Sequence, residues 1–458
     1  MENDSKIYLF EKAPVPQAIM KLAVPTILSS LVMVIYNLAD TYFVGMLNDS
    51  IQNAAVALAA PVLLAFNAVN NLFGVGSSSL MSRALGSKNY KLVHKSSAIG
   101  FYCALFFAAL ISILCLIFNG PLLNILGVTP ETSQATNDYL RWTVICGAVP
   151  AILNVVLAYM VRAEGASLHA SIGTMSGCIL NIILDPFFIL PWGLNMGAAG
   201  AGLATFLSNM VACLYFFILI HKKGENTFVC LRFSEFSLDK AVMFSIFAVG
   251  IPAAIQNLLN VTGMTILNNL TAGYGTDAVA AMGITQKINM VPMQMALGMS
   301  QGIMPLISYN YSSRNVDRMK NTLLTTIKIA LVFLIAVSAC YYFKADFFIQ
   351  LFMSKDSIVH YGSAFLRSFC LGLPFLCIDF IAVGVFQATG MGKEALFFAI
   401  MRKIVLEIPA LIILNMLNPL YGLAYAQLTS ELVLSALAIL FLIRLFKKLY
   451  KEKAAQAA

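Results

Sequence analysis

Charged residues are scarce in this sequence. Asp, Glu, Lys and Arg make up 11% of its 458 residues, whereas a soluble domain carries about 25%. The stretches 96–118 and 241–276 contain no charged residue at all, and a helix that spans a bilayer needs about 20 apolar residues. This shortage of charge excludes an ordinary soluble domain and predicts an integral membrane protein.

Other missing patterns narrow the class. No segment shows the apolar–polar alternation of membrane β-strands, so a helical bundle is expected. The nine cysteines are scattered and form no CxxC pair, which argues against a disulfide framework or a zinc site. The first residues, MENDSKIYLFEKAPVPQ, lack the features of a signal peptide. We therefore expect the first apolar segment to remain as a span.

Apolar segments separated by short polar or Gly/Pro-rich connections predict twelve transmembrane helices. The predicted spans are 19–47, 54–82, 95–118, 138–161, 167–190, 198–221, 241–271, 278–309, 321–343, 361–387, 394–416 and 420–444.

The basic residues predict the orientation of these spans. With the N-terminus inside, 24 of the 29 Lys and Arg residues fall at inner ends, and Lys287 lies within a span. Only Arg141, Lys344, Lys355 and Arg367 fall at outer ends. This excess follows the positive-inside rule. It predicts a multi-pass protein of the cell (inner) membrane with cytoplasmic termini, and it explains the net charge of +8 without a nucleic-acid partner.

The two halves of the chain repeat each other at an offset of about 226 residues, with 74–89 aligned to 299–315 and Ser82 to Ser308. Six spans per half give a parallel repeat, an architecture suited to alternating access. The expected fold is an all-α integral membrane protein with two pseudo-symmetric six-helix bundles. The predicted parts are an N-terminal lobe, a cytoplasmic linker, a C-terminal lobe and a basic cytoplasmic tail, at 1–221, 222–240, 241–446 and 447–458.

Two acids, Asp40 and Asp185, lie within predicted spans of the N-terminal lobe. A carboxylate at a helix centre costs about 2.5–3.5 kcal/mol, so each is expected to face a partner or an aqueous cavity. Asn181 and Asp185 lie at i and i+4 on one helix face. Pro186 leaves the carbonyl of Ile182 without its usual helical hydrogen bond, which adds a free oxygen nearby.

Asn154 in the fourth span and Thr205 in the sixth add an amide and a hydroxyl to this lobe. Oxygen ligands suit a hard cation, and two neighbouring carboxylates in an apolar site also favour holding a proton. The sequence thus predicts a proton or Na⁺ site at Asp40, Asn181 and Asp185. The alternative is that these side chains form separate hydrogen bonds between helices.

The C-terminal lobe does not repeat the acid pair, because Asp40 aligns with Ile266 and Asp185 with Ala410. That lobe has its own acid, Asp379, in its fourth span. A second ion site and a paired structural charge are both open for Asp379.

Four further charged residues are predicted to be structural. Lys403 and Glu407 lie at i and i+4 and can pair, while Arg402 lies near the inner end of its span and can snorkel. Lys287 is assigned a structural pairing with Glu407, Asp379 or Glu431, and Glu431 itself has no assigned partner.

A central cleft is expected to be lined by polar side chains and by methionines, whose polarizable thioethers make adaptable binding surfaces. Ordinary core packing is the alternative for the methionines. The candidates are Tyr36, Asn37, Gln256, Asn257, Asn260, Met290, Met293, Met295, Met299 and Asp379.

Several motifs, in their order and spacing, resemble those of the MATE (multidrug and toxic compound extrusion) transporters over nearly the whole chain. They are LADTYFVG (38–45), SRALGSKN (82–89), RAEG (162–165), NIILDP (181–186), QGIMPLISYNYSSRN (301–315), QATGMGK (387–393) and the segment from Arg402 to Pro409. The resemblance implies two six-helix lobes and efflux of cationic, amphipathic drugs driven by inward movement of Na⁺ or H⁺.

The resemblance also implies residue roles. Asp40, Asn181 and Asp185 match the ion-coupling residues of members with an N-lobe site, with Asn154 and Thr205 as supporting residues. Members with a C-lobe site carry an acid in the seventh helix, where this chain reads AAIQNLLN.

Two positions of the C-terminal lobe bear on the same comparison. Asp379 matches a family acid of the tenth helix. Lys403 stands where family members commonly have Gln.

The expected function is secondary antiport of small cationic amphipathic molecules by a monomer in the lipid bilayer, with no cofactor besides the coupling Na⁺ or H⁺. One alternative is a flippase of lipid-linked saccharides, which is disfavoured because few basic residues lie within the spans. A membrane-embedded enzyme of the prenyltransferase type is also disfavoured, because the sequence has no DDxxD-like cluster to bind Mg²⁺ and diphosphate.

Overall fold

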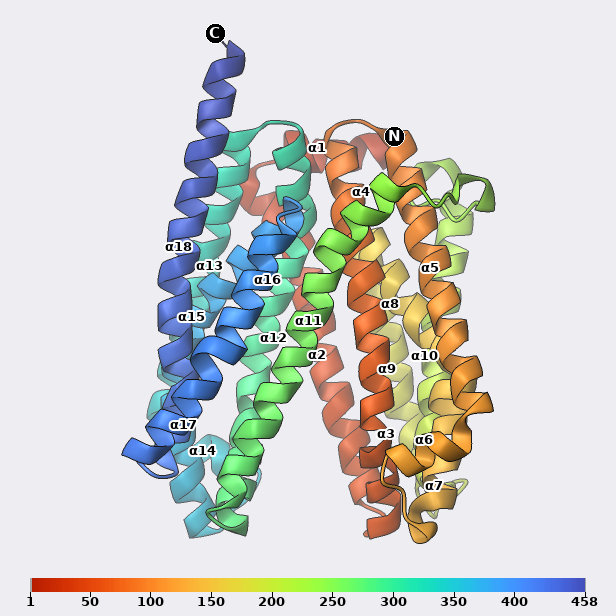
Figure 1. The fold of residues 1–458 in the computed structure, drawn as a ribbon, viewed down its shortest axis with the longest axis vertical. Helices are drawn as coiled ribbons and strands as arrows, with labels where there is room; N and C mark the ends of the chain where they lie inside the picture. Colours follow the sequence, from red (N-terminus) through yellow and green to blue (C-terminus); the bar gives the residue numbers. More distant parts are fainter. Residues whose placement is uncertain (1, 458) are drawn as a thin grey trace. The chain divides into compact units, whose positions relative to one another are not determined.

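The computed structural model describes the backbone of residues 2–457 and the side chains of residues 4–455. Helices account for almost all of this range, and no strand occurs within it (Figure 1). In the same range nine helices are long and apolar enough to cross a membrane, or ten if Pro130–Cys146 and Ala148–Ala163, bent by 49°, form one span. The all-α membrane fold predicted from the sequence is confirmed.

Two of the twelve predicted spans lie outside that set, for different physical reasons. Helix α12 (Thr276–Ser312) is long enough, but polar residues interrupt its apolar character. The other predicted span, 394–416, is divided into α16 (Gly392–Ile400), the π-helical segment η5 (Met401–Glu407) and α17 (Ile408–Leu417).

The chain forms two compact units. Unit 1 consists of Met1–Glu11 and Leu28–Ala254, and unit 2 of Lys12–Ile27 and Ile255–Ala458. Two helices, α2 (Val15–Gly45) and α11 (Lys240–Ala272), contribute to both units. The remaining elements of unit 1 are α1 (Glu2–Glu11), α3 (Ser50–Val69), η1 (Asn70–Val75), α4 (Gly76–Gly86), α5 (Tyr90–Ile117), α6 (Asn119–Ile125), α7 (Pro130–Leu140), η2 (Arg141–Cys146), α8 (Ala148–Ala163), α9 (Ser167–Ile189), α10 (Ala198–Lys223), η3 (Gly224–Asn226) and η4 (Phe233–Glu235).

Small residues bring α9 and α10 of unit 1 close together. A Cβ atom at Gly177 would lie 3.1 Å from the Cβ of Ala212 and 3.2 Å from the carbonyl oxygen of Ser208. Close backbone approach of this kind is a common way for membrane helices to associate. It places the polar residues of α9 against those of α10.

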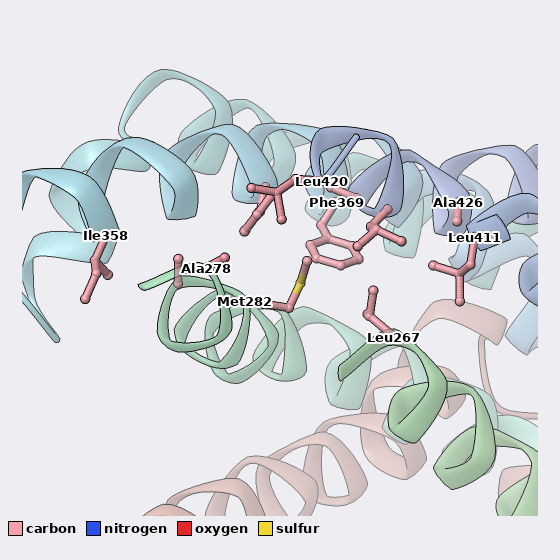
Figure 2. Close-up of a cluster of buried hydrophobic side chains, with 12 residues drawn as sticks. Leu267, Ala278, Met282, Ile358, Phe369, Leu411, Leu420 and Ala426 are labelled. Carbon is pink, nitrogen blue, oxygen red and sulfur yellow. The ribbon is translucent and has the colours of Figure 1, made fainter. Parts of the chain in front are cut away.

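Unit 2 is held together by α12, α15 (Asp356–Ala388) and α18 (Tyr421–Ala457), with α13 (Val316–Phe343) and α14 (Ala345–Gln350) alongside. Figure 2 shows part of its core, in which Leu267 of α11 and Met282 of α12 lie near Phe369 of α15 and Leu411 of α17. This cluster fixes one side of α12 and leaves the opposite side for other contacts.

The predicted repeat is visible at the level of single hydrogen bonds. Ser82 donates to the carbonyl oxygen of Ala163 at 2.9 Å, and Ser308 donates to that of Ala388 at 2.8 Å. The helices that follow start alike as well, because the side chains of both Asn89 and Asn315 accept a hydrogen bond from the backbone three residues on. The equivalences at Ser82 and Asn89 therefore hold in three dimensions.

Helix α1 is anchored to unit 1 by a buried ion pair. Lys6 Nζ lies 2.8 Å from Glu164 Oε1, and Lys6 also donates to the carbonyl of Asn226 at 2.9 Å. The other carboxylate oxygen of Glu164 accepts from the hydroxyl of Thr227 and from the backbone N–H of Phe228. The N-terminal helix and the 224–228 segment are thus joined through one glutamate.

Candidate functional site

Three of the predicted coupling residues lie together in unit 1. Asp185 and Asn181 occupy adjacent turns of α9 and are 0% and 2% exposed. With its amide nitrogen towards the acid, Asn181 donates to Asp185 Oδ2 at 2.8 Å, and its oxygen accepts from the backbone N–H of Thr205 at 3.1 Å. The i, i+4 spacing seen in the sequence therefore joins a carboxylate, an amide and the start of α10.

Asp40 lies near this cluster, on the part of α2 that belongs to unit 1. Its side chain is half-buried. Its charge acts on the carboxyl group of Asp185 and on the hydroxyl groups of Tyr36 and Tyr139. Tyr36 also interacts with the side chain of Thr205. Two carboxylates thus share one polar region of an otherwise apolar bundle.

Tyr139 is a member of this region that sequence reasoning missed. It lies in α7 and is almost completely buried. In the sequence it stands out only as part of a Tyr-Leu-Arg match between the two halves, which carries no chemical signal. A buried hydroxyl seldom lacks a polar neighbour, and this rule would have singled it out once its burial was known.

Asn154 does not share the hydrogen bonds of this cluster. Its amide nitrogen lies 2.9 Å from Asn209 Oδ1 and also bonds to the carbonyls of Pro150 and Ala151. These contacts join α8 to α10 and match the alternative reading, a structural hydrogen bond between helices.

The predicted charged residues of unit 2 form a buried group around Arg402 of η5. The guanidinium hydrogen bonds to Glu431, lies 3.6 Å from Asp379 Oδ2 and stacks 4.4 Å from the ring centre of Phe380. Glu431, left without a partner in the sequence analysis, is therefore paired. Arg402 is buried rather than snorkelling, because its two acid partners lie inside the bundle.

The other charged residues of unit 2 differ in whether and how they pair. Asp379, 1% exposed, faces Arg402 rather than an open cleft. Lys403 and Glu407 form the expected i, i+4 ion pair at 2.6 Å. Lys287 is exposed, and its ammonium has no ion pair or hydrogen bond within the described residues, contrary to the pairing expected for it.

The remaining cleft candidates are distributed over α2, α11 and α12. Asn37 is exposed and Tyr36 half-buried. The side-chain oxygen of Gln256 accepts a hydrogen bond from the amide nitrogen of Gln387 at 3.4 Å, so part of its hydrogen-bonding capacity is used within unit 2. The half-buried candidates of α11 and α12 are Asn257, Asn260, Met290, Met293 and Met295, whereas Met299 is buried in the core.

The described residues contain no group of three or more His, Cys, Asp or Glu side chains that could hold a metal ion. The oxygen atoms near Asp185 are instead of mixed type, from carboxylate, amide and hydroxyl groups. This set fits a small hard cation or a proton better than a transition metal, which prefers nitrogen or sulfur ligands.

Comparison with known proteins identifies the family. The MatE family profile matches the chain twice, at residues 25–187 and 252–413. The two matches begin 227 residues apart, in agreement with the internal repeat. The chain is 34% identical over 454 residues to the multidrug export protein MepA of Staphylococcus haemolyticus. The alignment covers 99% of this chain and 98% of that protein. The chain is equally similar to MepA of Staphylococcus aureus, at 34% identity over 446 residues and 96% and 97% coverage.

Solved structures agree with this assignment. A MATE protein in complex with MaL6 matches with a TM-score of 0.91 and 26% identity, over 97% of this chain and 99% of that one. A multidrug resistance MATE transporter in an outward-facing conformation matches with a TM-score of 0.91 and 27% identity, over 97% and 98%. Because the matched proteins are transporters, the expectation that this chain is not an enzyme is confirmed. The chain belongs to the MatE family of multidrug efflux transporters.

Proposed function

We propose that this protein is a secondary antiporter that exports cationic amphipathic compounds in exchange for inward movement of Na⁺ or H⁺. The observation that carries the proposal is the polar region of unit 1, where the charge of Asp40 acts on the buried carboxyl group of Asp185. Membership of a family of multidrug exporters supports the export activity. The two acids of this region support its coupling to the movement of an ion.

The energetics of two neighbouring acids support ion binding. An acid within the bilayer costs about 2.5–3.5 kcal/mol, and a second negative charge nearby raises that cost. A bound cation, or a proton on one carboxyl group, removes the repulsion between Asp40 and Asp185. Either ligand would therefore draw this part of α2 towards α9.

The amide of Asn181 supports the same proposal, because it holds the carboxyl group of Asp185 in place. Its nitrogen donates to the carboxylate at 2.8 Å, and its oxygen accepts from the backbone N–H of Thr205 at 3.1 Å. The acid is thereby fixed against α10, with the amide and the hydroxyl of Thr205 as neighbouring polar groups for a bound cation or proton.

The proposal includes the placement of the protein. The excess of Lys and Arg at inner ends favours cytoplasmic termini in the cell (inner) membrane, and we propose that the protein acts there as a monomer. In that orientation the two lobes, 1–221 and 241–446, are joined by the cytoplasmic linker 222–240.

The test is drug resistance conferred by Asp40→Asn and Asp185→Asn variants in a drug-hypersensitive host. Both variants are expected to lose resistance at normal expression, because neither can exchange its ion. Asp277→Asn is the matched control: it removes an acid that pairs with Lys355, at 2.7 Å, outside the proposed site. Wild-type resistance in the Asp40 and Asp185 variants would refute the proposal.

A second experiment separates the two ions. Purified protein in liposomes is given a Na⁺ gradient without a pH gradient, and then the reverse. The gradient that drives drug movement identifies the coupling ion, and drug movement that ignores both gradients would contradict antiport.

A further inference from the structure

Helix α18, which carries the C-terminus (Figure 1), has a row of basic side chains on one side of its last turns. We call this row the basic stripe and define it as Arg444, Lys447, Lys448 and Lys451, all of which are exposed. At 100° per residue the four positions lie within about 100° of one another around the helix. None of the four side chains forms an ion pair or a hydrogen bond within the described residues.

The opposite side of α18 packs against the rest of unit 2. Leu442, Phe446 and Leu449 are buried, and they lie about 150–170° around the helix from the middle of the basic stripe. This packing fixes the rotation of α18, so the stripe points away from the protein.

Two acids at this end of unit 2 are already paired. Asp317 of α13 accepts hydrogen bonds from Lys453 at 2.6 Å and from Tyr450 at 2.8 Å. Glu452 pairs with Arg314 at 2.9 Å. Neither acid therefore serves as a counter-charge for the basic stripe.

The basic stripe lies in a part of α18 that the internal repeat does not contain. Gly202-Leu203-Ala204 aligns with Gly422-Leu423-Ala424 at an offset of 220, so Lys223, the last residue of α10, corresponds to Ile443. In unit 1 the chain leaves the helix at Gly224 with φ of 49°, whereas α18 continues to Ala457. The six-helix bundle thus does not require this extension. The positive-inside rule explains basic residues at an inner end, but not their confinement to one side of a helix.

The exposed surface that precedes the stripe on the same side is apolar. Val433 and Leu440 lie within the same arc of α18 and are 41% and 53% exposed. The stripe itself extends over about 10 Å from Arg444 to Lys451, whereas the headgroup layer on each side of a bilayer is roughly 5–8 Å thick. One side of α18 therefore presents hydrocarbon first and positive charge next, in the order in which a phospholipid presents its acyl chains and its headgroup.

We propose that the basic stripe binds the headgroups of anionic phospholipids, whose acyl chains lie along Val433 and Leu440. The ammonium and guanidinium groups donate charge-assisted hydrogen bonds to the phosphate oxygens, and the inner leaflet of a membrane is rich in such lipids. A soluble acidic protein matches the charges but not the apolar surface next to them, so a lipid fits the whole face. The interaction surface is independent of the proposed antiport and holds the end of α18 at the membrane surface.

The test places one tryptophan beside the stripe. Both natural tryptophans, Trp142 and Trp192, are replaced by Phe, and Leu440→Trp adds a reporter about 10–12 Å along the helix axis from Lys447 and Lys448. The full-length protein is reconstituted in phosphatidylcholine bilayers. Quenching of the reporter is then measured with equal fractions of brominated phosphatidylglycerol or brominated phosphatidylcholine, which carries the same phosphate but no net charge.

Brominated phosphatidylglycerol is expected to quench the reporter more strongly than brominated phosphatidylcholine. One basic residue near an anionic surface contributes about fivefold to the affinity. Replacing both Lys447 and Lys448 by Gln should therefore lower the preference for phosphatidylglycerol at least fivefold, while replacing both by Arg should preserve it. Unchanged quenching by brominated phosphatidylcholine in these variants shows that α18 is still folded in the bilayer.

Two controls separate the stripe from a general effect of positive charge. Replacing Lys88 and Lys91 by Gln removes two exposed charges of unit 1 and should leave the preference at Leu440→Trp unchanged. A reporter at Phe106 of α5, which is 62% exposed, should show no preference between the lipids. Raising the salt from about 0.1 M to about 1 M, which shortens the screening length from about 10 Å to about 3 Å, should weaken the preference at Leu440→Trp.

Three outcomes would overturn the proposal. The first is equal quenching of Leu440→Trp by the two lipids, which is the result expected if the stripe binds a soluble acidic partner instead. The second is an equal loss of preference in the Lys88 and Lys91 variant, and the third is a preference that ignores salt.

Discussion

Arg402 hydrogen bonds to Glu431 across 29 positions of the chain, and neither side chain is more than 5% exposed. Asp379 completes a group with two acids and one base. Breaking a buried ion pair by removing one partner leaves the other charge unpaired, which is far more costly than removing both. Variants that remove one partner or both therefore test whether these three side chains are buried and paired.

Replacing Arg402 by Met is expected to destabilise the protein by about 3–5 kcal/mol, because Asp379 and Glu431 would remain buried without a counter-charge. Thermal unfolding of purified protein in detergent measures the effect. Adding Glu431→Gln to the Arg402→Met variant should restore part of the loss. A single Arg402→Met variant as stable as wild type would contradict the observed burial.

The anchor of α1 makes a second prediction. Lys6→Met should cost about 3–5 kcal/mol, because it leaves the carboxylate of Glu164 buried. The double variant with Glu164→Gln should cost less than the sum of the single changes. The exposed pair of Lys88 and Glu11, 3.8 Å apart, is the matched control, and Lys88→Met should change stability by less than about 1 kcal/mol. Equal costs for Lys6→Met and Lys88→Met would argue against the anchor.

The two serine contacts of the repeat should be energetically equivalent. Ser82→Ala and Ser308→Ala each leave a carbonyl oxygen, of Ala163 or Ala388, without its donor. Each change is expected to cost about 1 kcal/mol, the usual net value of one hydrogen bond. Unfolding of the two variants side by side measures this. A large cost at one site and none at the other would show that the repeat has lost its equivalence here.

The end of α18 is expected to detach at low pH. Hydrogen bonds from Lys453 and Tyr450 hold the pKa of Asp317 below its usual value. A lowered pKa means that the contact favours the charged acid. It is therefore complete above the ordinary pKa of Asp and is lost as the pH falls through the lowered value.

Hydrogen exchange of residues 446–455 measures this contact. At neutral pH, Asp317→Asn should increase exchange by at most about fivefold, because exposed ion pairs are weak. Lowering the pH through the lowered pKa of Asp317 should remove the difference between variant and wild type, after correction for the intrinsic exchange rate. Identical protection at neutral pH would mean that Asp317 does not hold this segment.

Much of the fold was predictable because it depends on local patterns. Long apolar segments give helices wherever they lie in a bilayer, and the pairing of Lys403 with Glu407 follows from helical spacing alone. The division of the predicted span 394–416 by η5 was not predicted, although Pro409 follows η5 by two residues and leaves the carbonyl of Val405 without its usual helical hydrogen bond. The partner of Glu431 was also hidden, because it comes from another helix and depends on how the helices pack.

The same distinction applies to the candidate site. Asn181 and Asp185 could be joined from their i, i+4 spacing, while the place of Tyr139 depends on the packing of α7 in unit 1. Asn154 shows the converse case. Its residue type fits both a coupling site and a bond between helices, and its contact with Asn209, which depends on how α8 packs on α10, gives the bond between helices.

The serine contacts at Ala163 and Ala388 have a consequence for how the two halves differ. Each contact needs only a hydroxyl and a backbone carbonyl, so it constrains no ionisable side chain. Two identical subunits would have to carry the same acids at equivalent depths. A single polypeptide with both halves in tandem is free of that requirement, and here it places two neighbouring acids, Asp40 and Asp185, in one half, where the other half has Ile266 and Ala410.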